Sequence, residues 1–121
     1  MNAVLWAGVL VIGGLGSVTR FMVDRAIARR AARSFPFGTF VVNISGAMLL
    51  GFVTGLALSH QVALLAGTAF LGAYTTFSTW MLETQRLAEE RQIWPALVNV
   101  VASMILGVTA AVVGQSIAGA L

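Results

Sequence analysis

Four long apolar segments constrain the fold of this chain more than any other feature of its sequence. They cover about residues 3–28, 37–58, 62–83 and 95–119. Each can cross the hydrocarbon core of a bilayer as a helix, for which about 20 residues suffice. The connections are too short to hold another folded unit, so we predict a single all-α membrane domain, residues 1–121, with four transmembrane helices.

The amino-acid composition supports this assignment and excludes several kinds of function. Hydrophobic residues make up 59% of the 121 residues and charged residues only 9%, a balance that a soluble domain does not show. The chain has no cysteine, which excludes disulfides, thiolate metal sites and cysteine nucleophiles. No nucleophile–base pair or metal-ligand cluster is visible, so we do not expect an enzyme. Arginine is the only residue that is positively charged at pH 7, and the net charge is +3. Arginines in a membrane protein of this kind mark the loops on one side of the membrane rather than a nucleic-acid surface, so we expect no nucleic-acid partner.

The placement of arginine predicts the topology. The first and third connections, with the helix ends beside them, hold Arg25, Arg29, Arg30, Arg33, Arg86 and Arg91. The opposite side, with both termini and the loop residue His60, holds none. Basic loops stay in the cytoplasm, so we predict a multi-pass protein of the cell inner membrane with both termini outside.

The polar residues at membrane depth indicate that the transported species is an anion and not a cation exchanged for protons. All four carboxylates, Asp24, Glu83, Glu89 and Glu90, lie at or beyond helix ends. Proton-coupled exporters keep such a group within the membrane. Glu83 is most simply explained by an exposed helix pair with Arg86, three residues later. The polar groups within the spans are mostly neutral donors, which suit an anion.

Asn43 and Arg20 each have two interpretations. Asn43 lies about two turns into the second segment, where its amide either forms an interhelical hydrogen bond or donates to a permeating anion. For Arg20 we favour a guanidinium that extends to the cytoplasmic interface over a role in the pathway, and even at the interface it would raise the anion concentration at a pore mouth.

The stretch GAYTTFSTW, residues 72–80, predicts a break in the third helix. Gly72 has low helix propensity, and the β-branched Thr75 and Thr76 follow it. A break frees backbone carbonyls, which hydroxyls, a second subunit or a cation must satisfy. Beyond it, Phe77 and Trp80 share one face, and Thr75 shares another with Thr79. The two rings either pack on a neighbouring helix or present their positive edges to an anion.

Small residues repeat every four positions on two of the segments. Ala47, Gly51 and Gly55 lie on the second segment, and Ser103, Gly107 and Ala111 on the fourth. Such stripes allow close helix packing, within the bundle or in a dimer.

With these motifs in order, nearly the whole chain resembles the Fluc/CrcB fluoride channels. The resemblance rests on residues 16–20, GTFVVNISG (38–46), FLGAYTTFSTW (70–80) with Glu83, and Ser103. It implies an antiparallel, dual-topology dimer with two pores and a structural Na⁺ at the two-fold axis. It also implies passive export of F⁻ that relieves fluoride toxicity.

The resemblance also implies roles for individual residues. Asn43 corresponds to the pore asparagine of the family, Phe77 to its first pore phenylalanine, and Trp80 to its second. The backbone carbonyls of Gly72 and Thr75 correspond to the Na⁺ ligands. The remaining positions of the implied fluoride pathway are Thr39, Thr76, Ser78, Thr79, Ser103, Arg20 and Glu83.

Three features depart from the family pattern. Trp80 is larger than the usual ring, and Gly107 stands where relatives often carry threonine. The arginine bias is stronger than an antiparallel homodimer favours, so the partner is either a second copy or an oppositely oriented paralogue.

Two other functions remain open from the residues alone. A small multidrug-resistance exporter also has four spans, but it needs a glutamate in its first helix, where residues 3–19 have none. A non-transporting assembly subunit would need only the small-residue stripes.

Overall fold

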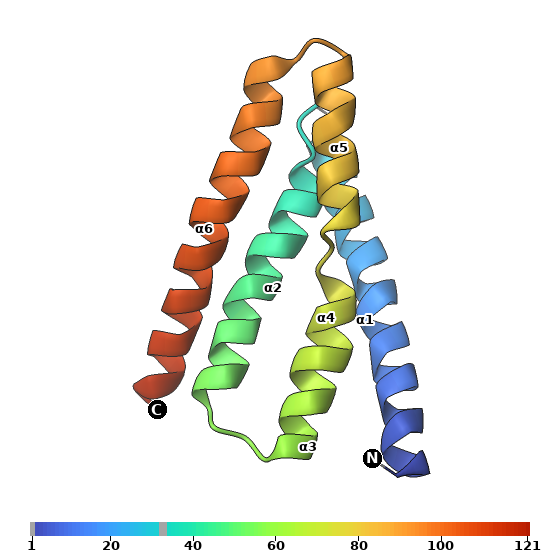
Figure 1. Cartoon of the computed structure of the whole chain (residues 1–121), viewed down its shortest axis with the longest axis vertical. Coiled ribbons are helices and arrows are strands. Elements are labelled where there is room, and N and C mark those ends of the chain that lie inside the picture. The colour runs from blue at the N-terminus through green and yellow to red at the C-terminus, as the bar shows by residue number, and fades with distance from the viewer. Residues whose placement is uncertain (1, 32–33) are drawn as a thin grey trace.

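The structure, a computed structural model, describes residues 2–31 and 34–121, and all regular secondary structure in this part of the chain is helical (Figure 1). Three spans are single helices, α1 (Ala3–Arg30), α2 (Phe37–Gly55) and α6 (Ile93–Gly119). The remaining span, between α2 and α6, contains α3 (His60–Ala63), the π-helix η1 (Leu64–Leu71), α4 (Gly72–Tyr74) and α5 (Ser78–Glu89). All four spans are long and apolar enough to cross a membrane, as the sequence predicts.

The ends of the spans differ from the predicted ones. α2 ends at Gly55 rather than 58, and Ala57 then adopts a left-handed conformation with φ 53°. His60, predicted to be a loop residue, is the first residue of α3. Ser59 caps this helix, because its hydroxyl accepts a hydrogen bond from the N–H of Val62. The predicted charged loop from residue 84 is largely helix, because α5 continues to Glu89 through residues of high helix propensity.

The four spans run alternately up and down (Figure 1). Both termini and the α2–α3 connection lie at one end of the bundle, and the α5–α6 connection lies at the other. Arg29 and Arg30 occupy the last turn of α1, and Arg91 follows α5. These arginines therefore share the end opposite the termini, as predicted, whereas Arg33 lies outside the described residues.

Close contact between α2 and α6 explains the small-residue stripe of α2 and, at Ala111, part of the stripe of α6. A Cβ atom on Gly51 would run into the backbone of Ala111, and one on Gly114 into the backbone of Met48. The α2 stripe is therefore confirmed as a packing face. On α6 the close contact is displaced from the predicted position, because a Cβ on Gly107 would meet only the Cδ1 atom of Ile44, at 3.9 Å.

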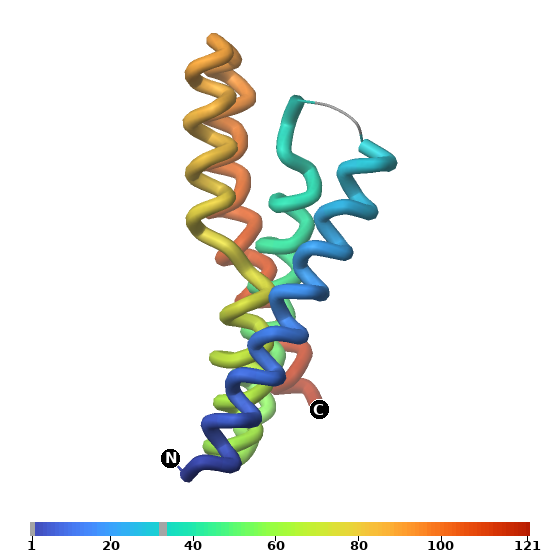
Figure 2. The backbone as a smooth tube through the Cα atoms, turned by 90° about the vertical axis from the view of Figure 1, so that its right-hand side faces the viewer, coloured from blue at the N-terminus to red at the C-terminus, as the bar shows by residue number. Residues whose placement is uncertain are grey.

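The packing changes along the third span. η1 and α4 lie against α1, whereas α5 lies against α6. Figure 2 shows this change of neighbours from the side, with α5 and α6 together at the end where α1 and α2 stand apart from them. The buried cluster Val42, Leu71 and Tyr74 lies where α2 meets the first half of the span.

Candidate functional site

The third span is not helical between α4 and α5. α4 ends at Tyr74, Thr75 has extended backbone with φ −79° and ψ 160°, and α5 begins at Ser78. The Thr75 N–H and hydroxyl both donate to the carbonyl of Leu71, at 3.0 and 2.9 Å. Because the helix ends here, the carbonyls of the residues that follow Leu71 in α4 lack the N–H donors four residues further along, and they need other partners.

Asn43 of α2 pairs with the backbone of this segment. Its Nδ2 donates to the carbonyl of Thr76 at 2.9 Å, and the N–H of Thr76 donates to its Oδ1 at 2.8 Å. The interhelical hydrogen bond, one of the two interpretations of Asn43, is therefore present. The pairing uses only one of the two amide N–H donors, so the other is not committed to it.

Close approach of α2 to the segment depends on Gly46. A Cβ atom there would overlap the Cγ2 atom of Thr75 and lie 3.2 Å from the ring of Tyr74. On the other side of the segment, the N–H of Thr79 donates to the Thr76 hydroxyl at 3.2 Å, which satisfies a free donor in the first turn of α5. The conformation is thus held from α2 and from α5.

Arg20 of α1 binds the same region. Its Nε donates to the carbonyl of Ala73 at 3.2 Å, in a partly buried position. The favoured prediction, a side chain extended to the cytoplasmic interface, is not what the structure shows. The freed carbonyl provides an acceptor within the bundle, which explains why the arginine bonds there.

An open groove of about 330 Å³ gathers several of the predicted pathway residues. It is lined by Asn43, Gly46, Ala47, Leu50, Thr75, Thr76, Phe77, Trp80 and Ser103. The rings of Phe77 and Trp80 share a face as predicted and meet edge to face, with centroids 5.6 Å apart and planes at 81°. Every lining residue is uncharged, and Phe77 is 70% exposed.

A much smaller cavity of about 20 Å³ lies between α1, α2 and α5. Its lining is Arg20, Asp24, Thr39, Val42, Thr76 and Thr79. A cavity of this size can hold one water-sized species. The predicted common face of Thr75 and Thr79 is wrong, because the extended backbone places Thr75 at the groove and Thr79 at this cavity.

Glu83 follows Thr79 by one turn and is half-buried. Its carboxylate lies beside the hydroxyl of Thr39, and its Oε1 is buried with no hydrogen-bond partner among the described residues. The predicted exposure of the pair with Arg86 is wrong, because α5 turns this carboxylate toward α2, but Arg86 lines the same pocket as Glu83 and still interacts with the carboxylate.

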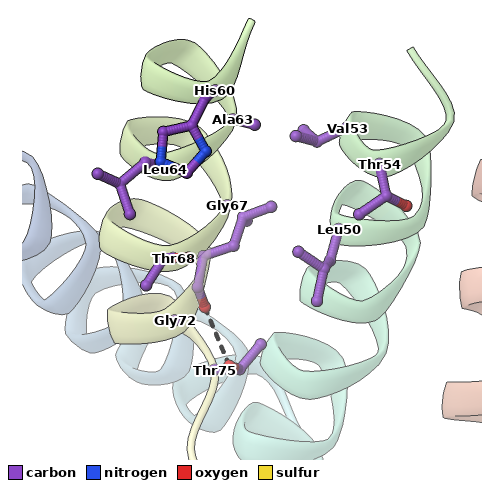
Figure 3. A pocket seen from close by; sticks show the side chains of 11 residues that line it. Leu50, Val53, Thr54, His60, Ala63, Leu64, Gly67, Thr68, Gly72 and Thr75 are labelled. Atoms are coloured by element: carbon purple, nitrogen blue, oxygen red, sulfur yellow. Dashed lines mark hydrogen bonds between the residues drawn. The ribbon is translucent and has the colours of Figure 1, made fainter. Parts of the chain in front are cut away.

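Gly72 and Thr75 line a separate hollow of about 450 Å³ between α2 and the first half of the third span (Figure 3). His60 lies at the same hollow. The remaining predicted pathway residue, Ser78, is exposed and lines neither this hollow nor the groove.

Asn99 of α6 is a buried polar residue that the sequence analysis did not select. It is 1% exposed, and its Nδ2 donates to the hydroxyl of Thr84 at 2.8 Å. The indole Nε1 of Trp80 donates to its backbone carbonyl at 3.1 Å. An asparagine in an apolar span was the available signal, as it was for Asn43.

Comparison with known proteins decides the family. The family model described as "CrcB-like protein, Camphor Resistance (CrcB)" matches residues 7–115. The chain belongs to the CrcB family. This confirms the resemblance found in the sequence and leaves the small multidrug-resistance alternative without support.

Several relatives of this chain are named fluoride-specific ion channels. A protein of Mycolicibacterium paratuberculosis named fluoride-specific ion channel FluC 2 is 68% identical over 94% of this chain and 93% of its own length. A protein of the same name in Mycobacterium tuberculosis is 64% identical over 98% and 94%. The fluoride-specific ion channel FluC 1 of Leifsonia xyli is 42% identical over 98% and 90%.

Proposed function

We propose that this chain is a passive, fluoride-selective channel of the inner membrane that exports F⁻ and relieves fluoride toxicity. The observation that carries the proposal is the uncharged groove in which Asn43, Phe77, Trp80 and Ser103 meet. The names of the CrcB relatives supply the ion.

The groove matches the physical demands of fluoride. Moving a bare ion from water into hydrocarbon costs tens of kcal/mol, so a pore must replace most of its hydration shell. Each hydrogen bond to a charged partner contributes about 1.5–3 kcal/mol, so several donors must act together. The uncommitted N–H of Asn43 and the ring edges of Phe77 and Trp80 offer such contacts. Ser103 lines the same groove, and its hydroxyl is buried with no hydrogen-bond partner among the described residues, so it is free to donate once it turns to the ion.

The same groove favours release as well as entry. A fixed positive charge at its centre would bind the anion too strongly for conduction, and the lining has none. Arg20 lies at the neighbouring cavity, where it raises the local anion concentration. We assign the residues around and beyond this cavity, Thr39, Thr76, Thr79, Ser78 and Glu83, to the rest of the polar pathway.

A structural Na⁺ fits the carbonyl groups of the third span. The N–H of Thr76, which would bond the carbonyl of Gly72 in a continuous α-helix, donates to Asn43 instead. The carbonyl of Thr75 lies outside any helix. Carbonyl oxygens are suitable ligands for a hard cation, so Gly72 and Thr75 would hold the ion, which supplies positive charge that neutralises the freed carbonyls.

The Na⁺ site and the pores require a second subunit in this proposal. The partner packs in antiparallel orientation and contributes its own carbonyls to the ion. It is either a second copy of this chain or an oppositely oriented paralogue, which the arginine bias favours.

Ion release from liposomes tests the proposal. Purified protein is reconstituted with either F⁻ or Cl⁻ inside, and a K⁺ ionophore sets the voltage. We expect rapid F⁻ release and no Cl⁻ release above that of protein-free liposomes. Equal release of both ions would overturn selectivity, and no release of either would favour an assembly subunit.

A further inference from the structure

A closed ring of hydrogen bonds joins α5 to α6 beside the aromatic pair of the groove. The indole Nε1 of Trp80 donates to the backbone carbonyl of Asn99 at 3.1 Å. The Asn99 Nδ2 donates to the Thr84 hydroxyl at 2.8 Å, and this hydroxyl donates to the Trp80 carbonyl at 2.8 Å. The three bonds therefore begin and end at Trp80.

The chemistry of the groups fixes the direction of each bond. An indole N–H can only donate. The Thr84 hydroxyl has one hydrogen, which it gives to the Trp80 carbonyl, so its oxygen accepts from Asn99. Asn99 must therefore present its nitrogen to Thr84, and its Oδ1 is left buried without a partner in the described part of the chain. The ring has a single arrangement.

Burial makes this arrangement restrictive. Asn99 is 1% exposed, so water cannot replace a lost bond easily. A rotation of the Trp80 indole would leave its N–H unpaired in a low-dielectric environment, which is costly. The orientation of Trp80, at 81° to the ring of Phe77, is therefore coupled to Asn99 and Thr84.

The ring also fixes α5 relative to the pathway residue of α6. Ser103 follows Asn99 by one helical turn and lines the same groove as Trp80. A shift between α5 and α6 would change the separation of Trp80 from Ser103. The width of the groove at this point thus depends on bonds made outside its lining.

We infer that Asn99 and Thr84 are positioning residues: their side-chain bond holds α6 against α5, and this keeps the backbone carbonyl of Asn99 in place to accept from the Trp80 indole and so sets the discrimination of fluoride from larger halides. This inference rests on the proposed function. Trp80 is the largest ring in the groove and has a donor that must be satisfied, so it requires an anchor of this kind.

A matched set of threonine variants tests the inference. Thr84→Val keeps the side-chain shape and removes two bonds of the ring, whereas Thr84→Ser keeps the hydroxyl. Thr109→Val is the control, because the Thr109 hydroxyl bonds only the carbonyl one turn earlier, that of Ile105, on an exposed face. Asn99→Val keeps the backbone carbonyl that accepts from Trp80 and removes only the side-chain bond to Thr84, so it tests whether that bond keeps the carbonyl in place.

Two readouts are needed. The first is the fluorescence anisotropy decay of Trp80 in full-length protein that carries Trp6→Phe and Trp94→Phe. The second is the ratio of F⁻ to Cl⁻ release from liposomes. We expect faster decay and a ratio lowered about tenfold in Thr84→Val and Asn99→Val, because both variants remove the buried hydrogen bond between Asn99 and Thr84. Thr84→Ser and Thr109→Val should match the parent.

The outcomes separate this inference from the proposed function. If the parent releases F⁻ and Thr84→Val retains both the parental decay and the parental ratio, the positioning role is overturned. A faster decay with an unchanged ratio would overturn the role in selectivity. No F⁻ release by the parent itself would overturn the proposed function, and the role in selectivity with it.

Discussion

Asn43 and Thr76 are paired through two hydrogen bonds of 2.9 and 2.8 Å, so that one side-chain amide satisfies both polar backbone groups of a residue 33 positions away. An asparagine amide has the same donor and acceptor as a peptide group, so it can replace the helical partners that Thr76 has lost. The non-helical segment of the third span is therefore stabilised by α2, and changes on α2 should alter it.

Asn43→Val should destabilise the protein and abolish fluoride release. Valine leaves the N–H and carbonyl of Thr76 without these partners, and each buried unsatisfied group costs about 1–3 kcal/mol. Thermal unfolding in detergent and liposome efflux measure the two effects. Thr54→Val, which removes a hydroxyl bonded only within α2, provides the control. A parental unfolding temperature in Asn43→Val would contradict the stabilising role.

Gly46→Ala should displace the segment from α2. The new Cβ would overlap Thr75, and overpacking of this kind costs about 1–3 kcal/mol. Gly14→Ala is the matched control, because a Cβ at Gly14 meets no atom within 4 Å. We expect a lower unfolding temperature and reduced F⁻ release only for Gly46→Ala. Equal unfolding temperatures and equal F⁻ release in the two variants would show that the contact between Gly46 and Thr75 does not hold the segment in place.

Ala57→Gly should stabilise the protein. Ala57 has φ 53°, and a left-handed conformation costs a residue with a Cβ about 1–2 kcal/mol more than it costs glycine. The unfolding temperature should rise, with unchanged fluoride release. Ala26→Gly, at an exposed position within α1, should lower it, by about 0.5–1 kcal/mol in stability. A decrease for both variants would argue against strain at Ala57.

Replacement of Na⁺ by the bulky cation N-methylglucamine should lower the unfolding temperature of the assembled protein. An ion that binds only the folded assembly stabilises it, by an amount that grows with the logarithm of the ion concentration once this exceeds the Kd. Choline, which is also too large for a cluster of carbonyls, should give the same result as N-methylglucamine. Identical unfolding in Na⁺ and in both large cations would argue against a bound Na⁺.

The sequence predicted those features that depend on local patterns. The length of the apolar segments identified the four spans. The low helix propensity of Gly72 and its β-branched neighbours indicated non-helical backbone close to the region between α4 and α5. The end of α5 does not follow from polarity, because the polar residues after position 83 resemble a loop in composition but have high helix propensity.

The contacts that shape the candidate site could not be predicted in the same way. The bond from Arg20 to Ala73 and the ring through Asn99 join residues distant in sequence, and they depend on how the helices pack. Extended backbone at Thr75 also changed which side chains share a face. Helical periodicity alone therefore assigned Thr75 and Thr79 to a common surface incorrectly.

The most direct test of the central claim is the ratio of F⁻ to Cl⁻ release from liposomes that contain the parent protein or Phe77→Ile. Isoleucine retains apolar bulk but has no aromatic edge to offer the anion. We expect fast, F⁻-selective release by the parent and its loss in Phe77→Ile, with both proteins assembled equally. Undiminished selective release by Phe77→Ile would contradict it.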